Sequence, residues 1–267
     1  MKKYELVTEL SKEFFGKTLF RIRALVSFGC VEKGDMGGWI EKEDNLSHEG
    51  KAWVSGEAQV SGKAKVYGEA QVYGEAWVYG EARVSGEARV SGKAKVYGKA
   101  QVYGKARVSG EVRVYGEAWV YGEARVSGKA RVSGEVRVYG EAQVYGEARV
   151  SGEARVSGEA WVYGEARVSG EARVSGKARV SGEAQVYGEA QVYGEAHYIT
   201  IGPIGSEGGV LTAFRQGDNS ILVSRGCFSG TIDEFAEAVR KRHGETGYAA
   251  EYEIVIKLIE ARLAEID

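Results

Sequence analysis

The fold is decided by the stretch V-Y-G-E-A-Q-V-Y-G-E-A-R at residues 138–149, in which one six-residue unit occurs twice. The unit continues in both directions from Val54 to Val192, where 24 Val stand six residues apart, each followed two residues later by Gly. Its general form is V-(Y/S)-G-(E/K)-A-(R/Q/K/W), and Val takes the place of Ala at Val112 and Val136. A repeat with this period predicts a hexapeptide β-solenoid.

The alternation of side chains along a strand explains the order of residues in the unit. Ala and Val point inwards, and the residue between them points outwards. Gly and the Glu or Lys that follows it form a corner, where Gly supplies backbone freedom. Three units close one triangular coil, so 24 units predict about eight coils and a rod about 35–40 Å long. A two-sided solenoid with two units per coil is the alternative, since a flat sheet would leave its edges exposed.

Composition narrows the class of protein. The chain has 267 residues, 39 of them Gly, and a formal net charge of −2 from 36 basic and 38 acidic residues. This balance gives no general attraction to nucleic acid or to an anionic membrane, so we expect neither as a partner. Cys30 and Cys227 provide no disulfide framework, and neither a membrane-length apolar run nor a signal-peptide core is present. We therefore expect a cytoplasmic protein.

The outward face of the repeat carries both charges. Arg is the commonest residue between Ala and Val, and Glu is the commonest corner residue, so we expect Arg–Glu pairs between neighbouring coils. Tyr alternates irregularly with Ser after Val and, assigned to three faces, gives no unbroken column. Trp77, Trp119 and Trp161 are separated by seven units each, so each falls on a different face. The pattern indicates a self-neutralising surface rather than an aromatic binding platform.

The N-terminal residues differ from the repeat and are predicted to close the first coil, because a solenoid needs caps at its open ends. Residues 1–50 are the expected β cap, with strands at 3–8 and 17–27 and with Trp39 as the plug. Residues 51–197 are the expected solenoid.

Residues 198–267 are predicted to form a small α+β domain. Its expected strands lie at 198–204, 210–215 and 221–224. Thr231 and Glu234 form a capping box that begins a helix, and Gly244 ends it. A second helix is expected over 249–264.

The same domain holds the residues that we expect to bind a small anion. A Gly-rich turn follows the first strand, and two Arg and the N–H groups at the helix start are expected to converge near it. The candidate ligand-binding residues are Gly205, Ser206, Arg215, Arg225, Cys227 and Thr231. Cys227 itself is expected to be a small buried residue rather than a nucleophile.

The second helix carries a broad apolar stripe that we expect to contact a partner or a second copy of the chain. The stripe consists of Tyr252, Val255, Ile256, Ile259 and Leu263, with Ile266 beyond them. Since the charged solenoid faces discourage a large dry contact, we expect this helix to mediate homo-oligomerisation, as a dimer.

The repeat and its flanking segments resemble a known group of proteins. The six-residue unit is similar to that of left-handed β-helix proteins with hexapeptide repeats. With K-G-D-M-G-G-W-I-E at 33–41, I-T-I-G-P-I-G-S at 199–206 and G-C-F-S-G-T at 226–231, the whole chain resembles phage and prophage hexapeptide-repeat proteins often labelled "polymer-forming cytoskeletal". The resemblance implies a left-handed parallel β-helix and a bacterial virus or prophage origin.

The resemblance to hexapeptide-repeat proteins also bears on enzyme activity. Acyltransferases of this fold use a His as general base, and related carbonic anhydrases hold zinc with three His. Here His48, His197 and His243 lie before or after the lattice of repeated Val, and none has metal-ligand spacing to another. We therefore expect no enzyme, no catalytic residue, no metal and no cofactor.

These observations predict a non-enzymatic phage accessory protein acting in the cytoplasm of a bacterial host. The solenoid would be a rigid scaffold, and the C-terminal domain would bind a host protein or self-associate, for example to inhibit an anti-phage defence. One alternative is a sponge that sequesters a small anionic signal such as a nucleotide. Another is a structural fibre or spike component of the virion.

Overall fold

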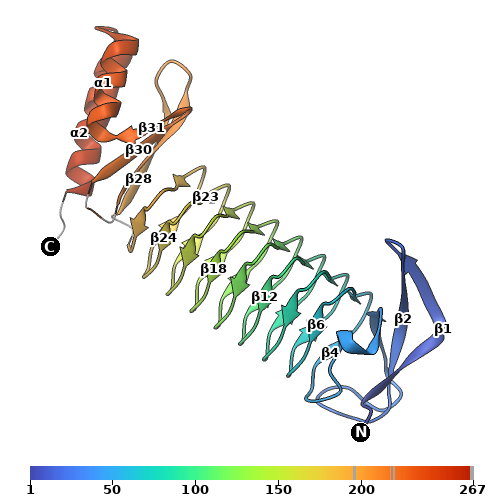
Figure 1. The fold of residues 1–267 in the computed structure, drawn as a ribbon. Helices are drawn as coiled ribbons and strands as arrows, with labels where there is room; N and C mark the ends of the chain where they lie inside the picture. Colours follow the sequence, from blue (N-terminus) through green and yellow to red (C-terminus); the bar gives the residue numbers. More distant parts are fainter. Residues whose placement is uncertain (195–196, 217, 219, 265–267) are drawn as a thin grey trace.

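The computed structural model describes residues 1–194, 197–216, 218 and 220–264. Figure 1 shows a rod of stacked coils, with a β-hairpin at its N-terminal end and a domain of one sheet and two helices at its C-terminal end. The rod is a β-solenoid of about nine turns with parallel sheets, and an antiparallel sheet and two helices follow it. The predicted mainly β fold class is confirmed.

The solenoid strands are short and fall on every repeat unit. They run from β4 (Trp53–Val54) to β27 (Gln191–Val192), and each consists of a lattice Val and the residue before it. From β4 to β24, each strand pairs in parallel with the strand three positions further along the chain, so that Val90 lies opposite Val108. One turn therefore contains three units and has three sides, which excludes the alternative of two units per coil.

The solenoid interior is filled by the repeated Val and Ala side chains. From Val54 to Val192 each lattice Val is at most 1% exposed, and each Ala from Ala52 to Ala190 is fully buried. Burying a Val side chain contributes roughly 1.5–3 kcal/mol. Because the same contact recurs at every turn, the core is one continuous column of small aliphatic side chains.

Each corner of the solenoid requires Gly for two separate reasons. The corner Gly from Gly50 to Gly188 have φ between +60° and +86°, a region that other residues rarely adopt. In addition, a Cβ on Gly128 would lie only 2.9 Å from both the amide N and the carbonyl O of Gly146, one turn further along. Backbone conformation and close stacking of successive corners thus explain the invariant Gly of the repeat.

The two units with Val in place of Ala widen the corner before them. The φ angles are +86° at Gly110 and +81° at Gly134, whereas the other corners from Gly50 to Gly188 lie between +60° and +74°. These two Gly directly precede the Glu-Val pairs that contain Val112 and Val136. The larger side chain is therefore accommodated by opening the turn, and both Val stay fully buried.

The solenoid begins earlier than the sequence predicts. After the antiparallel hairpin of β1 (Tyr4–Phe14) and β2 (Lys17–Ala24), β3 (Met36–Ile40) pairs in parallel with the solenoid strand β5 (Gln59–Val60). Leu46, just after the 3₁₀ helix Glu43–Asn45, forms a parallel bridge with Val66. The predicted boundary between residues 50 and 51 therefore lies inside the first turn, which explains about nine turns instead of eight.

No turn precedes the first one, so its carbonyls lack the backbone N–H donors that a preceding turn would supply. Side chains supply donors in their place. Within the rod, carbonyls of one turn accept N–H groups of the turn before it, as Ala88 does from Gln71 at 2.9 Å. At the N-terminal end three side chains supply these donors, one at each corner. The donor–acceptor pairs are Lys3 Nζ to Ala52 O at 2.8 Å and Gly50 O at 3.4 Å, Asn45 Nδ2 to Ala64 O at 2.9 Å and Gly62 O at 3.2 Å, and Arg21 Nη1 to Gly56 O at 2.7 Å.

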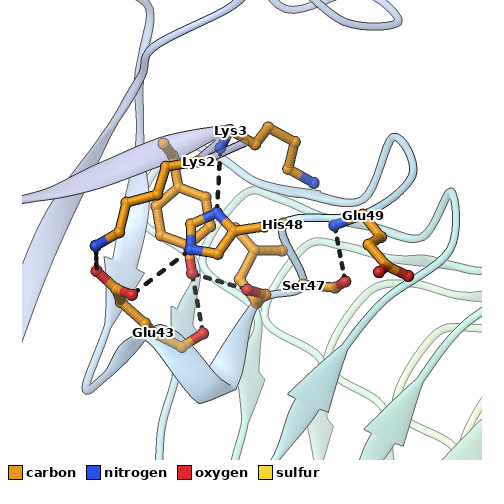
Figure 2. A network of polar contacts seen from close by, with 8 residues as sticks. Lys2, Lys3, Glu43, Ser47, His48 and Glu49 are labelled. Atoms are coloured by element: carbon orange, nitrogen blue, oxygen red, sulfur yellow. Dashed lines mark hydrogen bonds and ion pairs between the residues drawn. The ribbon is translucent and has the colours of Figure 1, made fainter.

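Further contacts hold the cap on the rod. Figure 2 shows the backbone N–H of Lys3 pointing at His48 Nδ1, 3.2 Å away, and Glu43 between Lys2 and His48. The aromatic ring of Tyr4 stacks on His48 with ring centroids 4.3 Å apart, and its hydroxyl donates to the carbonyl of Leu46 at 2.7 Å. The open edge that could pair with another chain is thereby covered.

Trp39 does not plug the solenoid, so that prediction is wrong. It occupies the outward position of β3, where its ring lies 4.2 Å from Lys12 Nζ and its Nε1 donates to Glu57 at 3.0 Å. Side chains alternate along a strand, so Gly38 and Ile40 face the core instead. The buried plug is formed by Tyr4, Ile22 and Trp53.

The C-terminal domain is a four-stranded antiparallel sheet with two helices. The strands are β28 (Tyr198–Ile204), β29 (Gly209–Arg215), β30 (Ile221–Arg225) and β31 (Phe228–Thr231), and the helices are α1 (Ile232–His243) and α2 (Gly247–Leu263). The strand β31 was not predicted, because F-S-G-T is short and contains Gly. The predicted capping box is present: Thr231 Oγ1 accepts the N–H of Glu234 at 3.2 Å, and the Glu234 carboxylate accepts the N–H of Thr231 at 2.8 Å.

The sheet of this domain also closes the rod. Phe214 of β29 is fully buried and belongs to the solenoid core, with its ring 5.5 Å from that of Tyr187. The Tyr187 hydroxyl is 2.6 Å from Ser229 Oγ, and the N–H of Gln185 donates to Thr212 Oγ1 at 3.2 Å. The rod and the domain are therefore joined by packing as well as by the chain. Neither helix among the described residues has the length and apolar composition needed to cross a bilayer.

Replacing a stacked corner Gly should destabilise the rod more than replacing an unstacked one. A Cβ at Gly182, where φ is +62°, would meet nothing within 4 Å, whereas a Cβ at Gly128, with φ +71°, would press on the backbone of Gly146. Ala in the left-handed region costs about 1–2 kcal/mol. We expect Gly182→Ala to lose about this much free energy of unfolding and Gly128→Ala to lose clearly more, measured by denaturant titration. Equal losses would show that stacking adds no constraint.

The buried ammonium of Lys3 should make stability depend on pH. Burial lowers the pKa of Lys3 from 10.5 to about 8. Between these values the unfolded chain binds the proton and the folded chain does not, so folding becomes more favourable as pH rises from 8 to 10.5. We expect the free energy of unfolding of the wild type to increase over this interval relative to Lys3→Met. The exposed Lys2→Met variant is the control, and a parallel pH profile for all three proteins would contradict the assignment.

Candidate functional site

A pocket of about 230 Å³ opens in the C-terminal domain between the two helices and two sheet turns. One turn joins β28 to β29, and the other joins β30 to β31. We call this site the arginine pocket. It is lined by Ser206, Glu207, Arg225, Gly226, Cys227, Phe228, Phe235, Ala238, Val239, Arg242, His243 and Tyr252.

The charged side of the arginine pocket consists of two guanidinium groups and one carboxylate. The Arg225 side chain is 11% exposed, and its Nη2 donates to the carbonyl of Ile204 at 2.9 Å. Its Nε is buried without a hydrogen-bond partner. Glu207 is 60% exposed and lies 2.7 Å from Arg242 but 3.9 Å from Arg225. A buried Arg with an unused donor is unusual, because such groups are costly to desolvate.

The Gly-rich turn lets side chains approach its backbone closely. Gly205 has φ +70°, and a Cβ there would overlap the Tyr252 hydroxyl at 2.1 Å. A Cβ on Gly209 would lie 2.7 Å from Arg225 Nη1. The Gly residues of this turn therefore make room for one wall of the pocket and for its buried Arg, rather than contacting a ligand through their N–H groups.

The opposite wall of the arginine pocket is apolar and aromatic. The rings of Phe228 and Phe235 have centroids 5.2 Å apart, and Phe235 meets Tyr252 edge to face at 5.5 Å. The two guanidinium groups lie beside this aromatic wall, so the pocket fits an anionic group that is attached to a short aliphatic chain. Among the residues that the structure describes, no group of three or more His, Cys, Asp or Glu is arranged to hold a metal ion.

The structure brings together three of the six predicted ligand-binding residues. Ser206, Arg225 and Cys227 line the arginine pocket. Gly205 lies beside it, but its N–H donates to Glu251 at 3.1 Å. Thr231 serves as the helix cap described above.

Two expectations about single residues of the predicted site are wrong. Arg215 does not join the pocket, because its guanidinium donates to the carbonyl of Leu263 at the far end of α2. Cys227 is exposed, not buried, because it stands in the turn after β30.

One wall of the arginine pocket comes from α1 and was not predicted from the sequence. Phe235, Ala238, Val239 and Arg242 follow the i, i+3, i+4, i+7 spacing of one helix face. That spacing was the available signal, and it would have placed Arg242 on the same face as the buried Phe235.

The stripe predicted as an oligomer interface forms the core of the domain instead. Tyr252, Val255, Ile259 and Leu263 are at most 7% exposed and pack with the sheet residues Leu211, Ala213 and Val223. Ile256 is half-buried against the same cluster. The prediction that these residues form an exposed interface is therefore wrong, because the sheet needs a cover and α2 supplies it. Ile266 lies outside the described residues.

The solenoid surface pairs its charges differently from the prediction. The ion pairs found along the described repeat join a corner Lys to the corner Glu of the next turn, for example Lys99 to Glu117 at 2.8 Å. Each of these four pairs joins Lys, not Arg, to Glu. Such exposed pairs contribute little to stability.

The Tyr and Trp side chains of the solenoid form local stacks. Tyr79, Tyr97 and Tyr115 stack in one column with centroids 4.9–5.0 Å apart, and two further columns contain three and two Tyr. No column spans the rod, as predicted. Burial and the neighbouring Tyr115 raise the pKa of Tyr97. Trp77, Trp119 and Trp161 lie on three different sheets, as predicted, and each ring is covered by the cation at the same position of the next turn.

Comparison with known proteins agrees with the fold. Four stretches of the rod match the YdcK Beta solenoid repeat. They are residues 100–116, 142–158, 148–164 and 166–182. No curated protein matches the chain. The match supports a β-solenoid repeat protein and concerns the rod, not the C-terminal domain.

Both thiols should be accessible in the folded protein. Cys30 and Cys227 are exposed and unpaired. We expect Ellman's reagent to titrate two thiols without denaturant, and Cys30→Ser and Cys227→Ser to leave one each. Reaction of Cys227 only after denaturation would contradict its position at the mouth of the pocket.

Proposed function

We propose that this chain is a non-enzymatic scaffold whose C-terminal domain binds a partner protein through an acidic group. The observation that carries the proposal is the state of Arg225 in the arginine pocket. Its guanidinium is nearly buried, its Nε is unpartnered, and its nearest carboxylate, Glu207, is 3.9 Å away on an exposed turn. A carboxylate from a partner would displace Glu207 and accept from Arg225 and Arg242 together.

The size of the pocket favours a protein side chain over a free metabolite. Small-molecule sites usually measure about 300–1,000 Å³, and this pocket measures about 230 Å³. That volume suits one acidic side chain, with its methylene groups against Phe228 and Phe235. A whole nucleotide would extend into solvent.

In this proposal the rod positions the C-terminal domain and does not itself bind the partner. Its two ends are closed by unlike structures, the Lys3–Asn45–Arg21 cap and the sheet that carries Phe214. Capped edges do not add further strands, so end-to-end polymerisation is not part of the proposal. The solenoid holds the binding domain at a fixed distance from the N-terminal hairpin.

The finer form of the proposal concerns the setting of the protein. The resemblance of its flanking segments to phage and prophage proteins supports an accessory role inside a bacterial host. The partner would then be a host protein, and inhibition of a defence protein is one such role. The alternative of a virion fibre or spike predicts the protein in purified particles, and we expect mass spectrometry of particles not to find it.

Partner binding can be tested with charge-removing variants of α1. Arg242 is 68% exposed on the rim of the pocket, so Arg242→Gln should leave the fold intact. Arg240→Gln, on the same helix outside the pocket, is the matched control. For a protein that the wild type recovers from host lysate, we expect Arg242→Gln to bind about tenfold more weakly and Arg240→Gln to bind normally. Equal binding by all three would overturn the assignment of the pocket.

The nucleotide-sponge alternative has its own measurement. Calorimetry with a panel of mono-, di- and cyclic nucleotides should give no binding heat under this proposal. Tight binding that Arg242→Gln abolishes would establish the sponge and replace the protein partner as the ligand.

A further inference from the structure

The helix α2 has two apolar faces, and only one of them is covered. The inner face packs on the sheet, as described above. The outer face carries Ala250, Ile254, Leu258 and Ala261, which are all exposed, with Ile254 at 69% and Leu258 at 49%. These positions are spaced by four, four and three residues, so they form one continuous stripe along the helix. We call it the outer stripe.

The neighbouring helix shows what an ordinary exposed face looks like in this domain. On α1, the exposed positions include Glu237, Arg240 and Lys241, which are charged. Both helices lie at the C-terminal end of the rod in Figure 1. A helix that is apolar on opposite sides is normally buried on both. The contrast with α1 therefore indicates that the outer stripe has a partner.

We propose that the outer stripe binds a second copy of this chain, with the two α2 helices packed antiparallel about a twofold axis between Ile254 and Leu258. This axis places Ile254 of one copy opposite Leu258 of the other, twice. The small Ala250 and Ala261 at the ends of the stripe allow the two helices to approach closely. The proposal concerns a different surface from the arginine pocket and does not rest on it.

The charges beside the outer stripe favour a second copy of the chain as the partner and an antiparallel arrangement of the two α2 helices. Glu251 and Arg262 flank one side of the stripe, at opposite ends of the helix, and both are exposed. In an antiparallel pair, Glu251 of each copy meets Arg262 of the other, whereas a parallel pair would set Glu251 beside Glu253 of the second copy. Glu253 and Lys257 on the other flank are also brought close to each other across the antiparallel axis. In a twofold arrangement of two identical chains, opposite charges therefore meet on both sides of the outer stripe.

The length of the helix bounds the strength of the contact. The 17 residues of α2 extend about 25 Å at 1.5 Å per residue. We therefore place the contact among the small interfaces, below about 1,200 Å², and expect a dissociation constant on the order of micromolar.

Sedimentation velocity of the full chain between about 1 and 200 µM tests the proposal, because micromolar dimers dissociate within that range. We expect the wild type to shift from monomer to dimer. Ile254→Glu and Leu258→Glu should stay monomeric with unchanged circular dichroism, since both positions are exposed. Arg240→Glu on α1 is the control and should dimerise normally. A wild type that stays monomeric at every concentration, or dimers that survive Ile254→Glu, would overturn the proposal.

A charge swap tests the antiparallel direction. Arg262→Glu and Glu251→Arg each place like charges at both contacts, so each should weaken the dimer by about tenfold. Arg262→Glu is the cleaner single variant, because Glu251→Arg also removes the acceptor of the Gly205 N–H. The double variant restores opposite charges and should recover the wild-type constant. Single variants that dimerise as well as the wild type would rule out the antiparallel contact. Thermal unfolding of each variant separates loss of association from loss of fold.

Discussion

The structure depends on the close approach of backbone at the corners of successive turns. From Gly50 to Gly170 each corner Gly has φ between +63° and +86° and stacks on the Gly one turn later, so that a Cβ would lie 3.3 Å or less from that backbone. This contact sets the spacing of the turns, and the spacing brings each Val onto the Val of the next turn. The Val and Ala core, the stacked Tyr and the Lys–Glu pairs all follow from that register. A high Gly content thus produces rigidity here, because the Gly positions are fixed by stacking.

The repeat made the rod predictable, and the ends were predictable only in part. Period, turn length and buried positions follow from residues that recur 24 times. The first turn was not predicted, because it does not keep the spacing of the repeat. Stacked strands in the rod are three units apart in sequence, whereas Ile40 and Leu46 are further than that from their partners Val60 and Val66. In the C-terminal domain, local signals such as the capping box at Thr231 were sufficient. The position of Arg215 and the choice of the buried face of α2 depend on tertiary packing, which spacing alone does not encode.

The two ends of the rod are closed in different ways. A solenoid end exposes main-chain groups that would otherwise pair with the next turn. At the N-terminal end, Lys3, Asn45 and Arg21 donate to the free carbonyls. At the C-terminal end a sheet covers the core with Phe214. That sheet also carries the arginine pocket and α2, so closing the rod and presenting a binding surface fall to one domain.

The distance between the two native cysteines tests the account of a rigid rod that carries its domain in a fixed position. Cys30 lies in the N-terminal cap and Cys227 in the C-terminal domain, and both are exposed. Spin labels on the two thiols, in protein diluted with unlabelled chain, report this distance by pulsed electron resonance. We predict one narrow peak beyond about 40 Å, the length of the stacked turns at roughly 4.8 Å each. A broad or bimodal distribution would contradict the account.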